Sequence, residues 1–222
     1  MTVDRNPPLP TGTMHTASPA VAGHAPLAFV LALATCFAPP GLRAQPAGAQ
    51  AVHGTASVVQ QGSRTIVTTA NGAGTSHSVI DWQSFSVPGG TATQFVQPGA
   101  TSTSINRVHG SDPSRIFGTL SSNGRLVLVN PAGIAVGAGA VVDTAGFTAS
   151  TLRMSDADAL AGRHVFGDGG AAGALSVDGR VLARSGDLVL LAPDIHVGEG
   201  AVLKSDTGAT LLAAGRRDGG SR

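Results

Sequence analysis

Histidines are the most versatile chemical side chains of this sequence, and their spacing argues against a metal site. His53, His77, His109, His164 and His196 stand singly in the chain, with no His-x-x-x-His pair. The only cysteine is Cys36, so no thiolate can complete a zinc site with them. We therefore expect these histidines at turns or at outward positions of strands.

Carboxylates are also spaced poorly for catalysis. Asp156 and Asp158 lie too close along the chain to face each other in a helix, and they are typical of charges in a first helical turn. Asp178, Asp187 and Asp194 lie near turns, where aspartate bonds the local backbone; a calcium site is the weaker alternative. We therefore predict a protein that is not an enzyme and carries neither a cofactor nor a metal.

A glycine-rich stretch, GIAVGAG (133–139), raises the question of a phosphate-binding loop. No Lys-Ser/Thr pair follows it and no long helix pattern opens after it, so this reading fails. Phosphate ligands are disfavoured overall, because 14 basic residues against 13 acidic ones give a net charge of +1. Nucleic acid is accordingly not an expected partner.

Composition favours many short strands joined by tight turns. Lys204 is the only lysine and Glu199 the only glutamate, so two good surface helix formers are almost absent. Glycine reaches 31 of 222 residues among abundant Thr, Ser, Val and Ala. The chemical side chains must therefore be positioned by a β-structure.

The N-terminal segment has the pattern of an export signal. Residues 25–38 form an apolar run of the length of a signal-peptide core, too short to span a bilayer. Small residues at Ala44 and Ala49 offer cleavage sites, so residues 1–49 are predicted to be a signal peptide with an extended n-region. Lipid attachment at Cys36 is disfavoured, because threonine precedes it. The predicted mature chain then contains no cysteine.

An internal repeat indicates a solenoid. GRLVLVNPAGIAVGAGAVV (124–142) aligns with GDLVLLAPDIHVGEGAVL (186–203) at an offset of 62 residues before a one-residue gap and 61 after it. The offset divides into about three units of roughly 20 residues, the size of one circuit of a parallel β-solenoid. An ordinary hairpin would also suit the turn residues, but the recurrence of the whole pattern favours the solenoid.

The sequence NPAGI inside this repeat predicts a sharp corner between two strands. Pro131 has no donor to lose from a strand ladder, and Gly133 can take a positive φ without a clash. Asn130 can bond the turn backbone through its amide. Val127 and Val129, just before the corner, are expected to point into the coil.

Other segments interrupt the strand pattern. SDADALAG (155–162) has Ser155 as a helix N-cap and Gly162 as a stop, which predicts a short helix near 155–161 that covers an edge or forms a long connection. Loops are expected at NGAGTSH, PGATST and GDGGAAG, which are residues 71–77, 98–103 and 167–173.

Trp82 and Phe85 alternate with polar residues, so we expect both in the core.

Four ordered motifs carry a family resemblance: VIDWQSFSV (79–87), QFVQPGATSTSINRV (94–108), GTLSSNGRLVLVNPAGI (118–134) and GFTASTL (146–152). They resemble the secretion domain of filamentous haemagglutinin and related high-molecular-weight adhesins, which are exported by two-partner secretion. The similarity covers nearly all of residues 50–215. Residues 216–222 are expected to be a disordered tail.

The resemblance implies an all-β, right-handed parallel β-helix. It implies export into the periplasm, recognition by an outer-membrane β-barrel transporter with periplasmic receptor domains, and folding at the bacterial cell surface. The family's Asn-Pro-Asn-Gly-Ile motif maps onto Asn130, Pro131, Gly133 and Ile134, with Ala132 in place of its second asparagine. Asn106 and Arg107, in the family-like stretch INRV, are candidates for surface recognition or corner bonding.

Two other functions stay open from the sequence. A β-helix polysaccharide lyase or hydrolase would need clustered aspartates with lysine or arginine on adjacent circuits, and a single lysine offers little. A free-standing adhesin fragment would bind host-cell or bacterial surface receptors, which the sequence does not name.

Overall fold

The computed structural model describes residues 45–167 and 170–215. The predicted signal peptide lies outside the described residues except for residues 45–49, and so does the predicted tail at 216–222. Among the described residues no helix is long and apolar enough to cross a membrane.

Eighteen strands in three sheets make up almost all of the described chain. Sheet I contains, in spatial order, β1 (Gln50–His53), β4 (His77–Trp82), β6 (Thr103–Val108), β9 (Arg125–Val129), β12 (Gly146–Ser150), β15 (Leu188–Ala192) and β18 (Thr210–Ala214). Sheet II contains β7 (Ser114–Ile116), β10 (Ile134–Val136), β13 (Leu175–Val177) and β16 (Ile195–Val197). Sheet III contains β2 (Thr55–Gln61), β3 (Arg64–Ala70), β5 (Ala92–Val96), β8 (Thr119–Ser122), β11 (Val141–Thr144), β14 (Arg180–Ala183) and β17 (Val202–Ser205).

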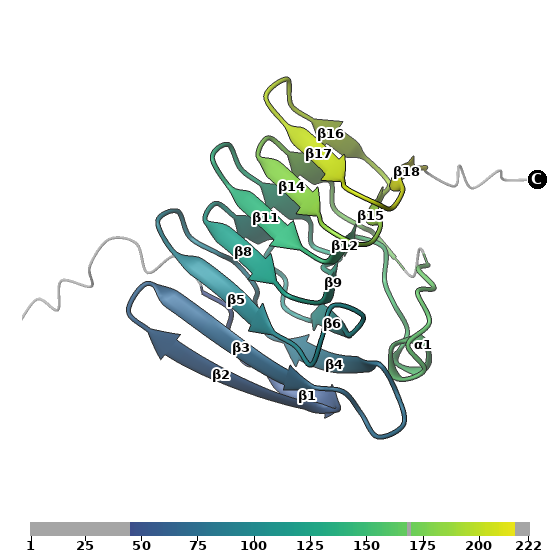
Figure 1. The fold of residues 1–222 in the computed structure, drawn as a ribbon. Coiled ribbons are helices and arrows are strands. Elements are labelled where there is room, and N and C mark those ends of the chain that lie inside the picture. The colour runs from purple at the N-terminus through teal and green to yellow at the C-terminus, as the bar shows by residue number, and fades with distance from the viewer. Residues whose placement is uncertain (1–44, 168–169, 216–222) are drawn as a thin grey trace, which may run out of the picture. The chain divides into compact units, whose positions relative to one another are not determined.

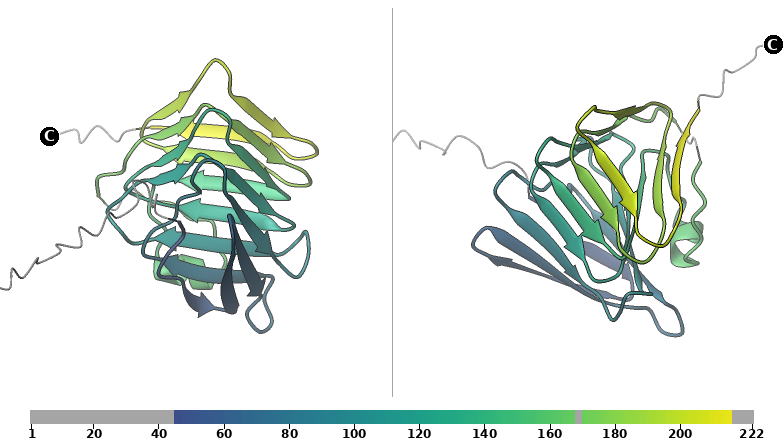
Figure 2. Two further views of the ribbon diagram at one scale, coloured as in Figure 1. Left: turned by 90° about the vertical axis from the view of Figure 1, so that its left-hand side faces the viewer. Right: turned by 45° about the horizontal axis from the view of Figure 1, so that its top comes forward.

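The chain visits sheets III, I and II in turn, so that each circuit stacks on the one before it (Figure 1; Figure 2). Neighbouring circuits pair in parallel and in register: Leu126 pairs with Phe147, and Leu188 with Thr210. These steps of 21 and 22 residues match the expected size of a circuit. The fold is the predicted parallel β-helix.

The repeat spans two circuits, and the expectation of three was wrong. Leu126 and Leu188, which align in the repeat, stack in one column with Phe147 between them. Ile134 and Ile195 likewise stand two circuits apart, separated by Leu175. The extra length is an excursion after β12, where the chain leaves the coil before it returns as β13.

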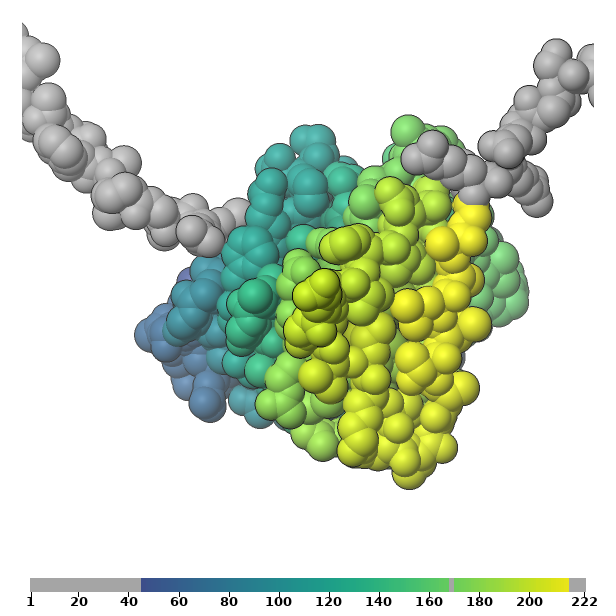
Figure 3. Space-filling view, turned by 90° about the horizontal axis from the view of Figure 1, so that it is seen from above, coloured from purple at the N-terminus to yellow at the C-terminus, as the bar shows by residue number. Residues whose placement is uncertain are grey.

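The two ends of the coil differ. At the N-terminal end, β1 runs antiparallel to β4 and β2 antiparallel to β3, and Ala56 of β2 packs onto the core. At the other end, coloured yellow in Figure 3, the last described circuit leaves Leu211 52% and Leu212 41% exposed. The antiparallel strands therefore cap the first circuit, whereas no strand of residues 45–167 and 170–215 covers the far side of β16, β17 and β18.

An inner core fills the coil. Leu126 and Leu128 of β9 point inward and begin two columns of buried side chains: Leu126 stacks with Phe147, and Leu128 stacks with Ala149 and Leu190. Trp82 and Phe85 are 1% exposed and pack edge to face with ring centroids 5.3 Å apart, which confirms the prediction that both belong to the core.

Val127 and Val129 point away from this core, so the prediction that they face into the coil was wrong. Strand side chains alternate, and Leu126 and Leu128 hold the inward positions of β9. The two valines are nevertheless buried, because residues 151–167 fold over the outer face of sheet I. We call this segment the strap. Its side chains close a second core, whose members are Val79, Ile105, Val127, Val129, Met154 and Ala159, with Phe166 packed against them.

The strap contains the predicted short helix, α1 (Asp156–Leu160), beside β4 and β6 (Figure 1). The Ser155 hydroxyl accepts a hydrogen bond from the Asp158 N–H, and Gly162 follows the helix with φ +65°. Arg153 and Gly167 exchange two backbone hydrogen bonds of 2.9 Å, which close the base of the strap. The strap is a long connection that covers a sheet face rather than an edge.

Candidate functional site

Asn130 holds the corner between sheets I and II. Its side chain is fully buried, and its Oδ1 accepts a hydrogen bond of 2.9 Å from the Ala132 N–H, as the sequence predicts. Its Nδ2 donates to the Ser114 hydroxyl at 2.9 Å and to the Asp112 carbonyl at 3.0 Å, both on the preceding circuit. One amide therefore closes its own turn and joins two circuits.

The rest of the corner turns the chain around Asn130. Gly133 has φ +128°, as predicted for this position, and its N–H donates to the Asn130 carbonyl at 3.0 Å. The Pro131 carbonyl accepts a hydrogen bond of 2.7 Å from Gly173 on the following circuit. Ile134 then enters the inner core at 2% exposure. The corner is thus bonded to the circuits on both sides.

Pro131 and Ala132 are the parts of the corner that reach the surface. They line a hollow of about 320 Å³ whose other walls are Val108, His109, Gly110, Ser111, Arg153 and Ala171. Ala132 is the position that the sequence resemblance aligns with the second asparagine of the Asn-Pro-Asn-Gly-Ile motif. A partner could touch the corner through these two residues but could not reach Asn130.

Asn106 lies inside the coil and not at the surface. It is 1% exposed, it pairs in register with Ile80 and Leu128, and its Oδ1 accepts a hydrogen bond of 2.9 Å from the Trp82 indole. Its Nδ2 donates to the Ser104 carbonyl at 3.0 Å. Asn106 therefore lies neither at the surface nor at a corner, as the sequence suggested, but in the core, where it satisfies the buried indole.

Arg107 lies on the opposite face of β6, beneath the strap. Its side chain is 6% exposed and donates to both carboxylate oxygens of Asp81 at 2.9 Å, and its Nη1 reaches Asp156 of α1 at 2.5 Å. His109 Nε2 lies 3.1 Å from the same Asp81. Arg107 thus ties the strap to sheet I. The sequence could not reveal the contact between Arg107 and Asp156, because the two residues lie 49 positions apart.

Histidines form a second contact between strap and coil. His77 of β4 is 8% exposed, hydrogen-bonds the Leu160 carbonyl through Nε2 at 3.1 Å, and stacks on His53 with centroids 4.5 Å apart. Partial desolvation lowers the pKa of His164 below its ordinary value, and the neighbouring Arg125 and His77 lower it further. The prediction that the histidines lie at turns or at outward strand positions is confirmed for His53. His77 is buried, because the strap covers it.

Catalytic groups do not gather at this corner. Within residues 45–167 and 170–215, no three His, Cys, Asp or Glu side chains are placed together to hold a metal ion. Asp187 bonds the Ala209 N–H on the next circuit at 2.8 Å, which is the turn role expected of it. The arrangement of these residues joins successive circuits and holds the strap.

Comparison with known proteins decides the family. Residues 43–220 match the TPS secretion domain, where TPS stands for two-partner secretion. The chain belongs to the TPS secretion-domain family. It is accordingly the secretion domain of an exported protein, as the sequence motifs imply.

Relatives of the TPS domain come from Haemophilus influenzae. A heme/hemopexin-binding protein is 30% identical over 176 residues, which are 77% of this chain and 19% of the relative, and a second protein of that name is 37% identical over 78 residues, which are 35% of this chain and 8% of that relative. The crystal structure of the HMW1 secretion domain matches with a TM-score of 0.65 and 28% identity, covering 76% of this chain and 44% of that one. The TPS domain thus spans about a fifth of the length of the first relative.

Replacing Asn130 with alanine is expected to destabilise the TPS domain by about 1–3 kcal/mol, because the Ala132 N–H and the Asp112 carbonyl lose a buried partner. Urea unfolding of the two proteins measures the difference. Ala132→Asn, which restores the family motif at a half-buried position, should change stability by less than about 0.5 kcal/mol. Equal stability of Asn130→Ala and the parent would contradict the bonding role.

Proposed function

We propose that an outer-membrane β-barrel transporter with periplasmic receptor domains recognises this TPS domain and threads it to the cell surface, where it folds as a β-helix. The family membership of residues 43–220 is the observation that carries the proposal. The domain acts as an export signal for the protein that contains it and not as an enzyme.

The fold supplies a physical reason for one-way export. Circuits pair in parallel with the circuit before them, so each completed circuit can template the next as the chain emerges. Each buried Leu, Ile or Val contributes roughly 1.5–3 kcal/mol. The only cysteine, Cys36, lies in the predicted signal peptide, so no disulfide would oppose threading after its removal.

Signal cleavage is proposed after Ala44 rather than after Ala49. Ala47 exchanges backbone hydrogen bonds with Ser84 at 2.9 and 3.3 Å, and the Gln45 side chain accepts one from Thr65 at 3.1 Å. Cleavage after Ala49 would remove these contacts from the first circuit. Mass spectrometry of the exported chain would identify the site.

The corner is the proposed contact surface for the transporter. Asn130, Gly133 and Ile134 fix its shape from within, and Pro131 and Ala132 present it at the hollow. Asn106 and Arg107 act indirectly, by bonding Trp82 in the core and by holding the strap.

Export with and without the transporter tests the function. The 222-residue chain should reach the medium when the transporter of the same bacterium is co-expressed, and should stay in the periplasm without it. Pro131→Gly with Ala132→Asp should reduce export while the purified variant keeps its fold. Release of the chain into the medium without the transporter would contradict the proposal. The proposal would also fail if the only activity of the purified chain were cleavage of acidic polysaccharides or binding to a receptor on cells.

A further inference from the structure

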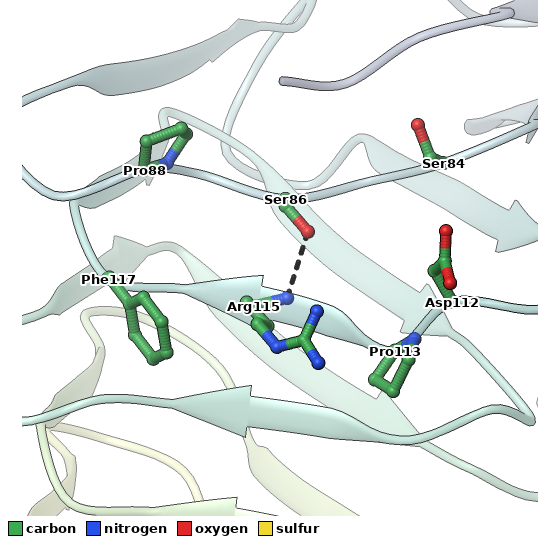
Figure 4. Close-up of a pocket in the computed structure, with 7 residues that line it drawn as sticks. All are labelled: Ser84, Ser86, Pro88, Asp112, Pro113, Arg115 and Phe117. Atoms are coloured by element: carbon green, nitrogen blue, oxygen red, sulfur yellow. Dashed lines mark hydrogen bonds between the residues drawn. The ribbon is translucent and has the colours of Figure 1, made fainter. Parts of the chain in front are cut away.

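A pocket of about 450 Å³ opens on the outer face of sheet II, next to the corner but separate from the hollow beside Pro131 (Figure 4). This volume is within the range of small-molecule sites. Its walls come from two adjacent circuits and consist of Ser84, Ser86, Pro88, Asp112, Pro113, Arg115 and Phe117.

Strand alternation builds the pocket. Phe85, Val87 and Ile116 point into the inner core, so the residues between them point outward. Val87 bridges Ile116, and the Arg115 N–H donates to the Ser86 hydroxyl at 3.0 Å, as the dashed line in Figure 4 shows. The two walls are therefore bonded to each other and the pocket is preformed.

Small residues on the next circuit keep one side of the pocket open. Ala135 pairs with Arg115 in the sheet, and Gly133 and Gly137 flank it at the neighbouring outward positions. A Cβ on Gly137 would lie 2.3 Å from Cδ1 of Phe117, so the ring occupies the space that a side chain there would fill. The glycine-rich stretch GIAVG thus serves this pocket rather than a phosphate.

Charge inside the pocket selects the ligand. Arg115 is exposed and forms no ion pair with a described residue. A guanidinium binds a carboxylate through two parallel hydrogen bonds, and Pro88, Pro113 and Phe117 offer apolar walls beside it. The carboxylate of Asp112 disfavours a polyanion such as a phosphate ester, but it can accept a ligand N–H.

Strand addition does not explain the pocket. β7 pairs with β10 on one side and meets Val87 on the other, so it has no free edge for an added strand. The ligand is therefore recognised by side chains, with its charged end at Arg115 and its apolar part against Phe117.

We propose that this pocket binds a carboxylate carried by an apolar group, as at the C-terminus of a peptide that ends in an apolar residue. Free aromatic acids share this chemistry. The site does not depend on the proposed export role, because its geometry belongs to the folded domain.

Titration of the folded 222-residue chain with phenylacetate, N-acetylphenylalanine and N-acetylphenylalanine amide tests the proposal. NMR shifts of Arg115 and Phe117 report binding. Both acids should bind in the millimolar range, with N-acetylphenylalanine tighter if Asp112 accepts its N–H, whereas the neutral amide should bind at least about tenfold more weakly.

Matched variants locate the site. Arg115→Gln should weaken binding of both acids at least about tenfold, because it removes the cation but keeps the Arg115 backbone bond to Ser86. Arg64→Gln, at an exposed arginine of β3 in another sheet, should leave binding unchanged. Ala135→Leu should close the open side and also abolish binding.

The amide binding as tightly as the acid would overturn the proposal, as would acid binding that survives Arg115→Gln. The absence of shifts at Arg115 and Phe117 would overturn it as well. Equal binding of phenylacetate and N-acetylphenylalanine would support the carboxylate chemistry and point to a free acid as the ligand.

Discussion

Replacing Leu128 with aspartate is expected to prevent folding of the TPS domain. Leu128 is fully buried between Asn106 and Ala149 in the inner core. The change removes a packed side chain, which costs about 2–5 kcal/mol even for alanine, and adds a buried carboxylate that costs several kcal/mol more. That sum is comparable to the whole stability of a domain, about 5–15 kcal/mol.

Circular dichroism and thermal unfolding of the purified 222-residue chain measure this loss. Thr148→Asp is the matched control, because it places the same charge half-buried on the outer face of the neighbouring strand β12. This control should retain a cooperative transition, and Leu128→Asp should not. A cooperative transition in Leu128→Asp would show that the inner core tolerates a charge and would undermine the assignment of inward residues on β9.

The coil could be predicted from the sequence because it repeats. Columns such as Leu126, Phe147 and Leu188 are apolar in each circuit, and the amide of Asn130 and the positive φ of Gly133 suit one turn geometry. The number of circuits in the repeat could not be predicted in the same way. The strap adds length between β12 and β13 without breaking the alignment on either side of it.

The strap also explains the error at Val127 and Val129. A run of five residues in which four are apolar, RLVLV, fits a strand buried on both faces as well as a strand with one face in a core. The side chains that pack against the outer face of β9 decide between these arrangements. Two of them, Met154 and Ala159, are distant in the sequence, so the strand alone does not reveal them. The Asp81, Arg107 and Asp156 contacts escape prediction for the same reason.

Replacing Arg107 with methionine is expected to release the strap. The side chain is 6% exposed, and Asp81, at 21%, would lose its bidentate partner while Asp156 of α1 loses its contact with sheet I. Removing one member of a buried ion pair costs about 3–5 kcal/mol; because Asp156 is 83% exposed, most of the expected cost, about 2–4 kcal/mol, comes from Arg107 and Asp81. Hydrogen exchange should therefore rise most at Ala159, Ala161 and Gly162, whose N–H groups are bonded within the strap.

Arg184→Met separates this role from the general loss of an arginine. Arg184 also makes a bidentate pair, with Asp143, and that pair lowers the pKa of the Asp143 carboxyl. Both partners are exposed, at 51% and 37%, so solvent screens the interaction and its removal should leave stability and strap exchange nearly unchanged. If both variants exchanged alike, the second core under the strap, and not Arg107, would be what holds it to sheet I.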